Sequence, residues 1–141
     1  MKLTTKGRYA VMAMADIAVN QKIKPVSLKD ISLRQNISLS YLEQLFSKLK
    51  NRKLVKSVRG PLGGYMLEKN PKDIKISNII FAVDEEVKTL NCNRDSKKSC
   101  QGKSVKCITH HLWVDLEQHI NDFFDSTNLG DLIKQKQSDL N

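Results

Sequence analysis

One short stretch of the chain collects the side chains best suited to binding a metal ion or a metal cluster. The cysteines are Cys92, Cys100 and Cys107, and His110 follows three residues after the last of them. Residues three apart are neighbours on a helix, so Cys107 and His110 can reach one centre. The span 92–107 has a net charge of +4, which favours thiolates over thiols. Three thiolates and one imidazole suit a tetrahedral zinc site or an iron-sulfur cluster.

The ligand spacing alone leaves three interpretations open, namely zinc, an iron-sulfur cluster and unligated thiols. An odd number of cysteines argues against a disulfide framework. His111 and His119 are weaker candidate ligands than His110. On a helix the His111 side chain would be turned by about 100° from that of His110, and His119 would lie more than two turns further along.

Basic side chains are concentrated in the first half of the chain. The 141 residues (16.1 kDa) carry a net charge of +9, and residues 1–60 alone hold 13 basic and three acidic side chains, for +10. Residues 61–141 hold 11 basic and 12 acidic side chains, for −1. The first half is therefore expected to bind a polyanion if a suitable reading motif is present.

Composition and missing motifs exclude several classes of protein. With 40% hydrophobic and 28% charged residues, the chain fits one compact domain with an appended element. No apolar run approaches the roughly 18 residues that a membrane span needs, so we expect a cytoplasmic protein without a membrane partner. The sequence lacks a nucleotide-binding glycine loop, a nucleophile elbow and a paired carboxylate constellation, so an enzyme is not expected. A ferredoxin-like electron carrier would leave the basic half unexplained.

The basic half predicts three helices, over 4–20, 27–36 and 41–51. A threonine hydroxyl is available to cap the first helix, and capping-box patterns of a serine three residues before an acid open the other two, at Ser27 and Ser40. In the third helix the apolar residues follow the i, i+3, i+4, i+7 spacing of one buried stripe, which comprises Leu42, Leu45, Phe46 and Leu49. Two short helices joined by a tight turn are typical of a helix-turn-helix.

Two strands, 54–59 and 65–67, are predicted on either side of the turn Gly60–Gly64. That hairpin would form a wing beside the third helix. The predicted fold class is therefore mainly α with a small β-hairpin wing, a winged helix-turn-helix domain followed by a long C-terminal dimerisation helix.

The exposed face of the third helix and the wing hold the candidate DNA contacts, which are Ser38, Ser40, Tyr41, Glu43, Gln44, Lys48, Arg59 and Gly60. Gln44 can pair with an adenine edge, and Arg59 can enter a narrow minor groove. Glu43 either caps its own helix or accepts a hydrogen bond from cytosine. Phosphate contacts are expected from basic residues, namely Lys2, Lys6, Arg8, Lys48, Arg52 and Lys56.

The second half predicts a short helix over 77–83 and an apolar stripe on a helix that ends near residue 125. The stripe consists of Leu112, Leu116, Ile120 and Phe123, widened by Trp113, Val114 and Phe124. A stripe this wide needs a partner, and we expect a homodimer. The predicted division is a DNA-binding domain at 1–83, a cluster-binding loop at 84–110, a dimerisation helix at 107–125 and a C-terminal tail at 126–141, with a short helix over 129–133.

Four stretches together resemble the bacterial winged-helix repressor family of the Rrf type, over nearly the whole chain. They are Leu3-Thr4-Thr5-Lys6-Gly7-Arg8-Tyr9-Ala10, Ile37-Ser38-Leu39-Ser40-Tyr41-Leu42-Glu43-Gln44-Leu45-Phe46, Arg59-Gly60-Pro61-Leu62-Gly63-Gly64-Tyr65, and Cys107-Ile108-Thr109-His110 with Leu112-Trp113.

This resemblance implies a homodimeric transcriptional repressor that binds a palindromic double-stranded operator and controls genes for iron-sulfur cluster assembly. It also implies a 2Fe-2S cluster, supplied by the assembly machinery and held by Cys92, Cys100, Cys107 and His110. The intervals between the cysteines are a residue or two longer than is usual for such regulators. A zinc-stabilised repressor, or a thiol or nitric oxide sensor of the same fold, is the alternative.

Overall fold

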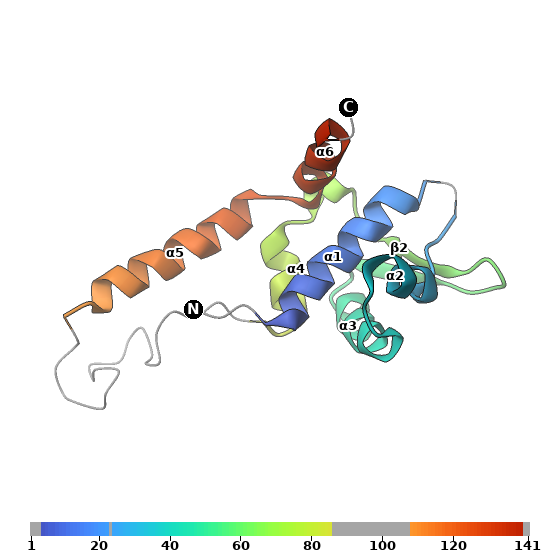
Figure 1. Cartoon of the computed structure of the whole chain (residues 1–141), viewed down its shortest axis with the longest axis horizontal. Coiled ribbons are helices and arrows are strands. Elements are labelled where there is room, and N and C mark those ends of the chain that lie inside the picture. The colour runs from blue at the N-terminus through green and yellow to red at the C-terminus, as the bar shows by residue number, and fades with distance from the viewer. Residues whose placement is uncertain (1–3, 23, 86–107, 140–141) are drawn as a thin grey trace.

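The computed structural model describes residues 4–22, 24–85 and 108–139 (Figure 1). The elements in chain order are α1 (Thr5–Asn20), α2 (Leu28–Gln35), α3 (Leu39–Asn51), β1 (Val55–Val58), β2 (Gly64–Leu67), a 3-10 turn η1 (Pro71–Asp73), α4 (Ile76–Ala82), α5 (His110–Ser126) and α6 (Leu129–Asp139). A mainly helical chain with one hairpin confirms the predicted fold class. None of the helices in this part of the chain is long and apolar enough to cross a bilayer.

The first three helices lie where the sequence predicts them, but two of the predicted caps are wrong. Ser27 caps α2 by accepting a hydrogen bond from the Asp30 amide at 3.1 Å, as expected. At α3 the cap is Ser38, not Ser40, so the helix begins two residues earlier and Ser40 lies in its first turn. Ile37 explains the shift, because its buried side chain anchors the chain just before Ser38. The Thr4 side chain does not cap α1.

The hairpin is a two-stranded antiparallel sheet in which Val55 pairs with Leu67 and Val58 with Gly64. An isolated bridge between Val26 and Tyr65 ties the turn end of β2 to the segment before α2, with hydrogen bonds of 3.0 and 2.7 Å. The wing is therefore attached to the domain close to its turn, one pair away from Val58 and Gly64.

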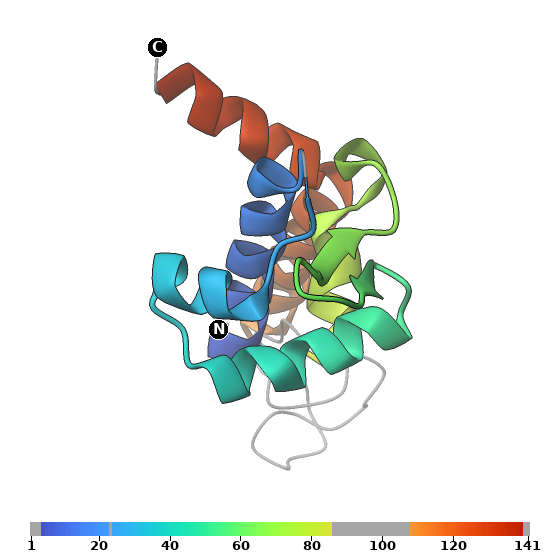
Figure 2. The ribbon, with the colours of Figure 1, turned by 90° about the vertical axis from the view of Figure 1, so that its right-hand side faces the viewer.

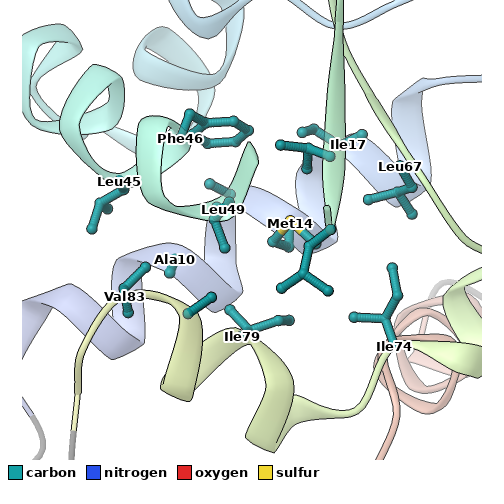
Figure 3. Packing of buried hydrophobic residues seen from close by; sticks show 14 of the residues in the cluster. Ala10, Met14, Ile17, Leu45, Phe46, Leu49, Leu67, Ile74, Ile79 and Val83 are labelled. Carbon is teal, nitrogen blue, oxygen red and sulfur yellow. The ribbon is translucent and has the colours of Figure 1, made fainter. Parts of the chain in front are cut away.

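One hydrophobic core joins α1, α3, β2 and α4 (Figure 3). The four residues of the predicted α3 stripe, Leu42, Leu45, Phe46 and Leu49, are all buried. Phe46 also contacts the Tyr65 ring, with centroids 4.9 Å apart. Burying a side chain of this size contributes about 2 to 3 kcal/mol, so this stripe attaches α3 firmly to α1 and α4.

The C-terminal helices differ from the prediction in length. α5 begins at His110, because residues 108 and 109 form a turn, whereas the helix was predicted over 107–125. It ends at Ser126, one residue beyond the predicted end, and it projects away from the other helices (Figure 1). α6 runs over 129–139, whereas a short helix over 129–133 was expected. A reciprocal cap starts α6: the Asn128 side chain accepts from the Asp131 amide at 2.9 Å, and the Asn128 amide donates to Asp131 at 3.1 Å. With Leu129 fully buried against the core, the tail is part of the domain, and α6 lies at the opposite end from α3 (Figure 2).

Candidate nucleic-acid interface and ligand site

The first two turns of α3 present an exposed polar surface. Ser38, Ser40, Glu43 and Gln44 are all exposed there, and the hydroxyls of the two serines lie 3.0 Å apart. Among the described residues Glu43 makes no hydrogen bond or ion pair, so the local capping role predicted for it is wrong. Its carboxylate is therefore available to whatever docks on this surface.

Tyr41 is less available than the sequence suggested. Its side chain is half-buried, its hydroxyl lies 3.2 Å from the Thr5 hydroxyl, and its ring meets the Tyr9 ring edge-on at 5.9 Å. Tyr41 therefore joins the start of α3 to the start of α1. No local sequence pattern indicates this contact, because Thr5 and Tyr41 lie 36 positions apart.

The candidate phosphate contacts differ in exposure and pairing. Arg8 and Lys56 are exposed, as is Arg59, the candidate minor-groove contact. Two cations at the C-terminal end of α3 contact the end of α4: Lys48 Nζ lies 3.0 Å from Asp84 Oδ2, and Arg52, the C-cap residue, lies over the Phe81 ring at 4.7 Å. Lys6 is half-buried. Lys2 lies outside the described residues.

Glycines shape the turn of the wing. Gly60 is exposed with φ 121°, a conformation that L-residues rarely adopt. A Cβ on Gly63 would lie 2.2 Å from the Val58 carbonyl oxygen, so the two sides of the turn can approach only with glycine there. The turn holds Arg59 at its exposed edge.

A buried carboxylate joins α1 to α2 behind the exposed surface. Asp16 accepts hydrogen bonds from Arg34 Nη2 at 2.7 Å, Arg34 Nε at 3.0 Å and Gln35 Nε2 at 2.9 Å. Burial raises the pKa of Asp16, but the hydrogen bonds from Arg34 and Gln35 and the charge of Arg34 outweigh burial, so the pKa is lowered overall. This network holds the first helix of the helix-turn-helix in place. No local sequence pattern links Asp16 to Arg34, 18 positions further along the chain.

A second buried carboxylate lies at the start of α1. Glu85 accepts from the Gly7 amide at 3.0 Å and from the hydroxyl and amide of Thr4. Burial raises the pKa of Glu85, yet these hydrogen bonds and the Lys6 charge lower it overall. Glu85 therefore supplies the cap that the Thr4 hydroxyl does not make. No local sequence pattern links Glu85 to Gly7, 78 positions away.

His110 is the one predicted ligand within the described residues, and it is the first residue of α5. Its ring is 2% exposed, and its Nδ1 is the only buried side-chain nitrogen or oxygen in this part of the chain that lacks a hydrogen-bond partner. An unsatisfied buried nitrogen is costly, so such an atom fits a metal ligand. Cys92, Cys100 and Cys107 lie outside the described residues. No three metal-ligating side chains converge within 4–22, 24–85 and 108–139.

α5 exposes the apolar stripe that the sequence predicts. Leu112 is 59% and Phe123 63% exposed, and Trp113 and Leu116 are also exposed, whereas Phe124 packs against the core. An apolar groove of about 410 Å³ lies beside this helix, between α1, α4, α5 and α6, with Val11, Ile80 and Phe123 in its lining.

Relatives of known class match almost the whole chain. The Rrf2 family, described as an iron-dependent transcriptional regulator, matches residues 3–135. The HTH-type transcriptional regulator IscR of Pectobacterium atrosepticum is 52% identical over 137 residues, which cover 97% of this chain and 82% of that protein. IscR of Vibrio campbellii is 53% identical over 137 residues, covering 97% of this chain and 80% of that protein.

Solved structures agree with the sequence matches. CymR of B. subtilis, the global cysteine regulator, superposes with a TM-score of 0.80 at 34% identity, covering 96% of this chain and 98% of CymR. IscR of T. potens superposes with a TM-score of 0.76 at 38% identity, covering 96% and 88% of the two chains. These relatives are transcriptional regulators and not enzymes, which confirms both that expectation and the resemblance drawn from the sequence. The chain belongs to the Rrf2 family of DNA-binding transcriptional regulators.

Proposed function

We propose that this protein is a cytoplasmic, homodimeric repressor that senses iron-sulfur cluster status through a 2Fe-2S cluster held by Cys92, Cys100, Cys107 and His110. Its targets would be palindromic operators of cluster-assembly genes, and the assembly machinery would supply the cluster. The observation that carries the proposal is the buried, unpartnered Nδ1 of His110.

His110 is suited to the role because its position is fixed while its ligating nitrogen is free. It begins α5, so a group bound there would be linked to the orientation of the apolar helix that follows. When bound, the cluster would supply a redox-active and labile centre.

The reading surface of the proposed repressor is the exposed face of α3 with the wing. Ser38, Ser40 and Gln44 would contact the major groove, with Tyr41 beside them, while Glu43 would select cytosine and repel incorrect sites. Arg59 and Gly60 lie on the wing, where a guanidinium could enter the minor groove. Lys48 and the exposed basic residues would bind phosphates.

The second copy would cover the apolar stripe of α5. Leu112, Leu116 and Phe123 share one face, and the adjacent groove extends that apolar surface onto the domain. Leu116→Lys should therefore shift the protein from dimer to monomer in sedimentation equilibrium. Asp125→Lys, a lysine on the opposite face of the same helix, is the control and should leave the dimer intact. A dimer that survives Leu116→Lys would contradict this interface.

The sensing proposal is tested with protein purified without oxygen. We expect visible absorption, iron and acid-labile sulfide in wild type, and the loss of all three in Cys100→Ala. His110→Ala should destabilise the centre, whereas His111→Ala, which alters the exposed neighbouring ring, should not. Colourless protein that contains zinc would establish the alternative. Reconstitution that leaves operator affinity unchanged would contradict the sensing role.

A further inference from the structure

The C-terminal turn of α4 has a fixed backbone conformation and lies next to α3. The Asp84 amide donates to the Phe81 carbonyl at 3.1 Å, and the Glu85 amide donates to the Ile80 carbonyl at 3.1 Å. Asp84 has φ 59°, in the left-handed region. This pair of hydrogen bonds with a left-handed residue is a Schellman motif, in which glycine is the commonest residue at the position of Asp84. Aspartate is tolerated there, so its side chain can serve another purpose.

Three neighbouring side chains of this turn contact DNA-binding elements. Asp84 pairs with Lys48 of α3, the Phe81 ring lies under Arg52, the C-cap residue of α3, and Glu85 accepts a hydrogen bond at the start of α1. Lys48 and Arg52 are one helical turn apart, so both project from the same side of α3. The end of α4 therefore engages two successive cations of the helix proposed to read DNA.

Lys48 continues the row of residues proposed to face DNA. Ser40, Gln44 and Lys48 are spaced by four residues, and side chains at that spacing stack along one face of a helix. The ammonium group of Lys48 therefore lies beside the proposed reading surface, and it also pairs with the carboxylate of Asp84 in its own domain. Hydrogen bonding by Lys48 and the charges of Lys48, Lys6 and Arg52 keep the pKa of Asp84 low, so it remains a full negative charge near neutral pH.

We infer that Asp84 is a positioning residue that competes with DNA phosphate for Lys48 and thereby limits the affinity of the protein for DNA. The inference rests on the proposed role of α3 as the DNA-reading helix. The Lys48 and Asp84 side chains are 42% and 66% exposed, so the pair is in contact with water and can open. A DNA phosphate that binds Lys48 must displace the Asp84 carboxylate. The displaced negative charge then remains close to the DNA backbone and repels it.

The test measures binding of the full chain to a mixed-sequence duplex of about 30 base pairs by fluorescence anisotropy at several salt concentrations between about 50 and 200 mM. Asp84→Asn removes the charge and keeps the shape of the side chain. We expect this variant to bind about threefold more tightly. The slope of log affinity against log salt should become steeper by up to about 0.9, the value expected for one added phosphate contact. Asp73→Asn makes the same change in net charge in η1, away from α3, and should change the affinity less.

Two further variants separate competition from a merely structural role. Asp84→Gly retains the left-handed turn, so it should unfold at no lower temperature than wild type and should also bind DNA more tightly. In a Lys48→Gln background, Asp84→Asn should have no further effect, since the cation it releases is absent. Unchanged or weaker binding by folded Asp84→Asn, or tighter binding that persists without Lys48, would overturn the inference. Wild type that binds no duplex at all would overturn the proposed DNA interface as well.

Discussion

Replacing Asp16 with asparagine should weaken the attachment of α2 to α1 measurably. The substitution keeps the shape of the side chain but removes the charge that accepts two hydrogen bonds from Arg34, at 2.7 and 3.0 Å. Hydrogen bonds to charged groups contribute about 1.5 to 3 kcal/mol each. The Asp16 side chain is 1% exposed but that of Arg34 is 41% exposed, so water can partly replace the hydrogen bonds that the guanidinium loses in the variant. Discounting for that exposure, we expect Asp16→Asn to lower the free energy of unfolding by about 2 kcal/mol.

Thermal unfolding followed by circular dichroism measures this loss. For a domain of this size, about 2 kcal/mol corresponds to a midpoint lower by roughly 6 to 10 °C. Glu68→Gln, which neutralises an exposed acid at the end of the hairpin, is the control and should shift the midpoint little. Arg34→Gln and the double variant complete a cycle, in which we expect a coupling of about 1 kcal/mol or more. A midpoint within about 2 °C of wild type for Asp16→Asn would refute the reasoning about this network.

Three further predictions concern the wing, the response to acid and the tail. Gly63→Ala should distort the wing, because its Cβ would lie 2.2 Å from the Val58 carbonyl; DNA affinity should fall while the unfolding temperature changes less. The folded-state pKa values of Asp16 and Glu85 are lowered, so their stabilisation is fully present above the unfolded pKa near ~4 and is lost as pH falls through the folded values; urea unfolding should show this loss below about pH 4. Leu129→Ala should cost about 2 to 5 kcal/mol, because this side chain is fully buried where α6 packs on the domain; an exposed tail would give almost no change in a urea titration.

The parts of the fold that depend on local patterns could be predicted from the sequence. The four apolar residues of the α3 stripe have the spacing of a helix, and the wing contains residue types typical of turns, so each pattern is compatible with few other local structures. The start of α3 could not be resolved in this way, because Ser38 and Ser40 both offer a capping hydroxyl. Burial of Ile37, a tertiary contact, decides between them.

The helical part of the C-terminal tail shows the same limit in another form. Beyond residue 133 the sequence is polar, and a polar segment at a terminus predicts fraying. The structure continues α6 to Asp139 because its start is doubly fixed, by the reciprocal cap of Asn128 and Asp131 and by the buried Leu129. Once a helix is nucleated, each further residue adds a hydrogen bond at little cost, so a firm start extends the helix.

A long-range ion pair explains why the net charge of the basic half overstates what it presents to a ligand. The +10 of residues 1–60 already counts Asp16 against Arg34, but it does not count Asp84, the acid from the other half that pairs with Lys48. Asp84 belongs to the nearly neutral half, and no local pattern links it to α3 across 36 positions. The distribution of basic residues in the sequence can therefore locate a DNA-binding half. It does not show which of those cations are unpaired, because that depends on where acids from the other half lie in the folded protein. Asp84 lies at the end of α4, directly against the helix proposed to read DNA, so this turn is where affinity for DNA can be adjusted without changing a residue of the reading surface.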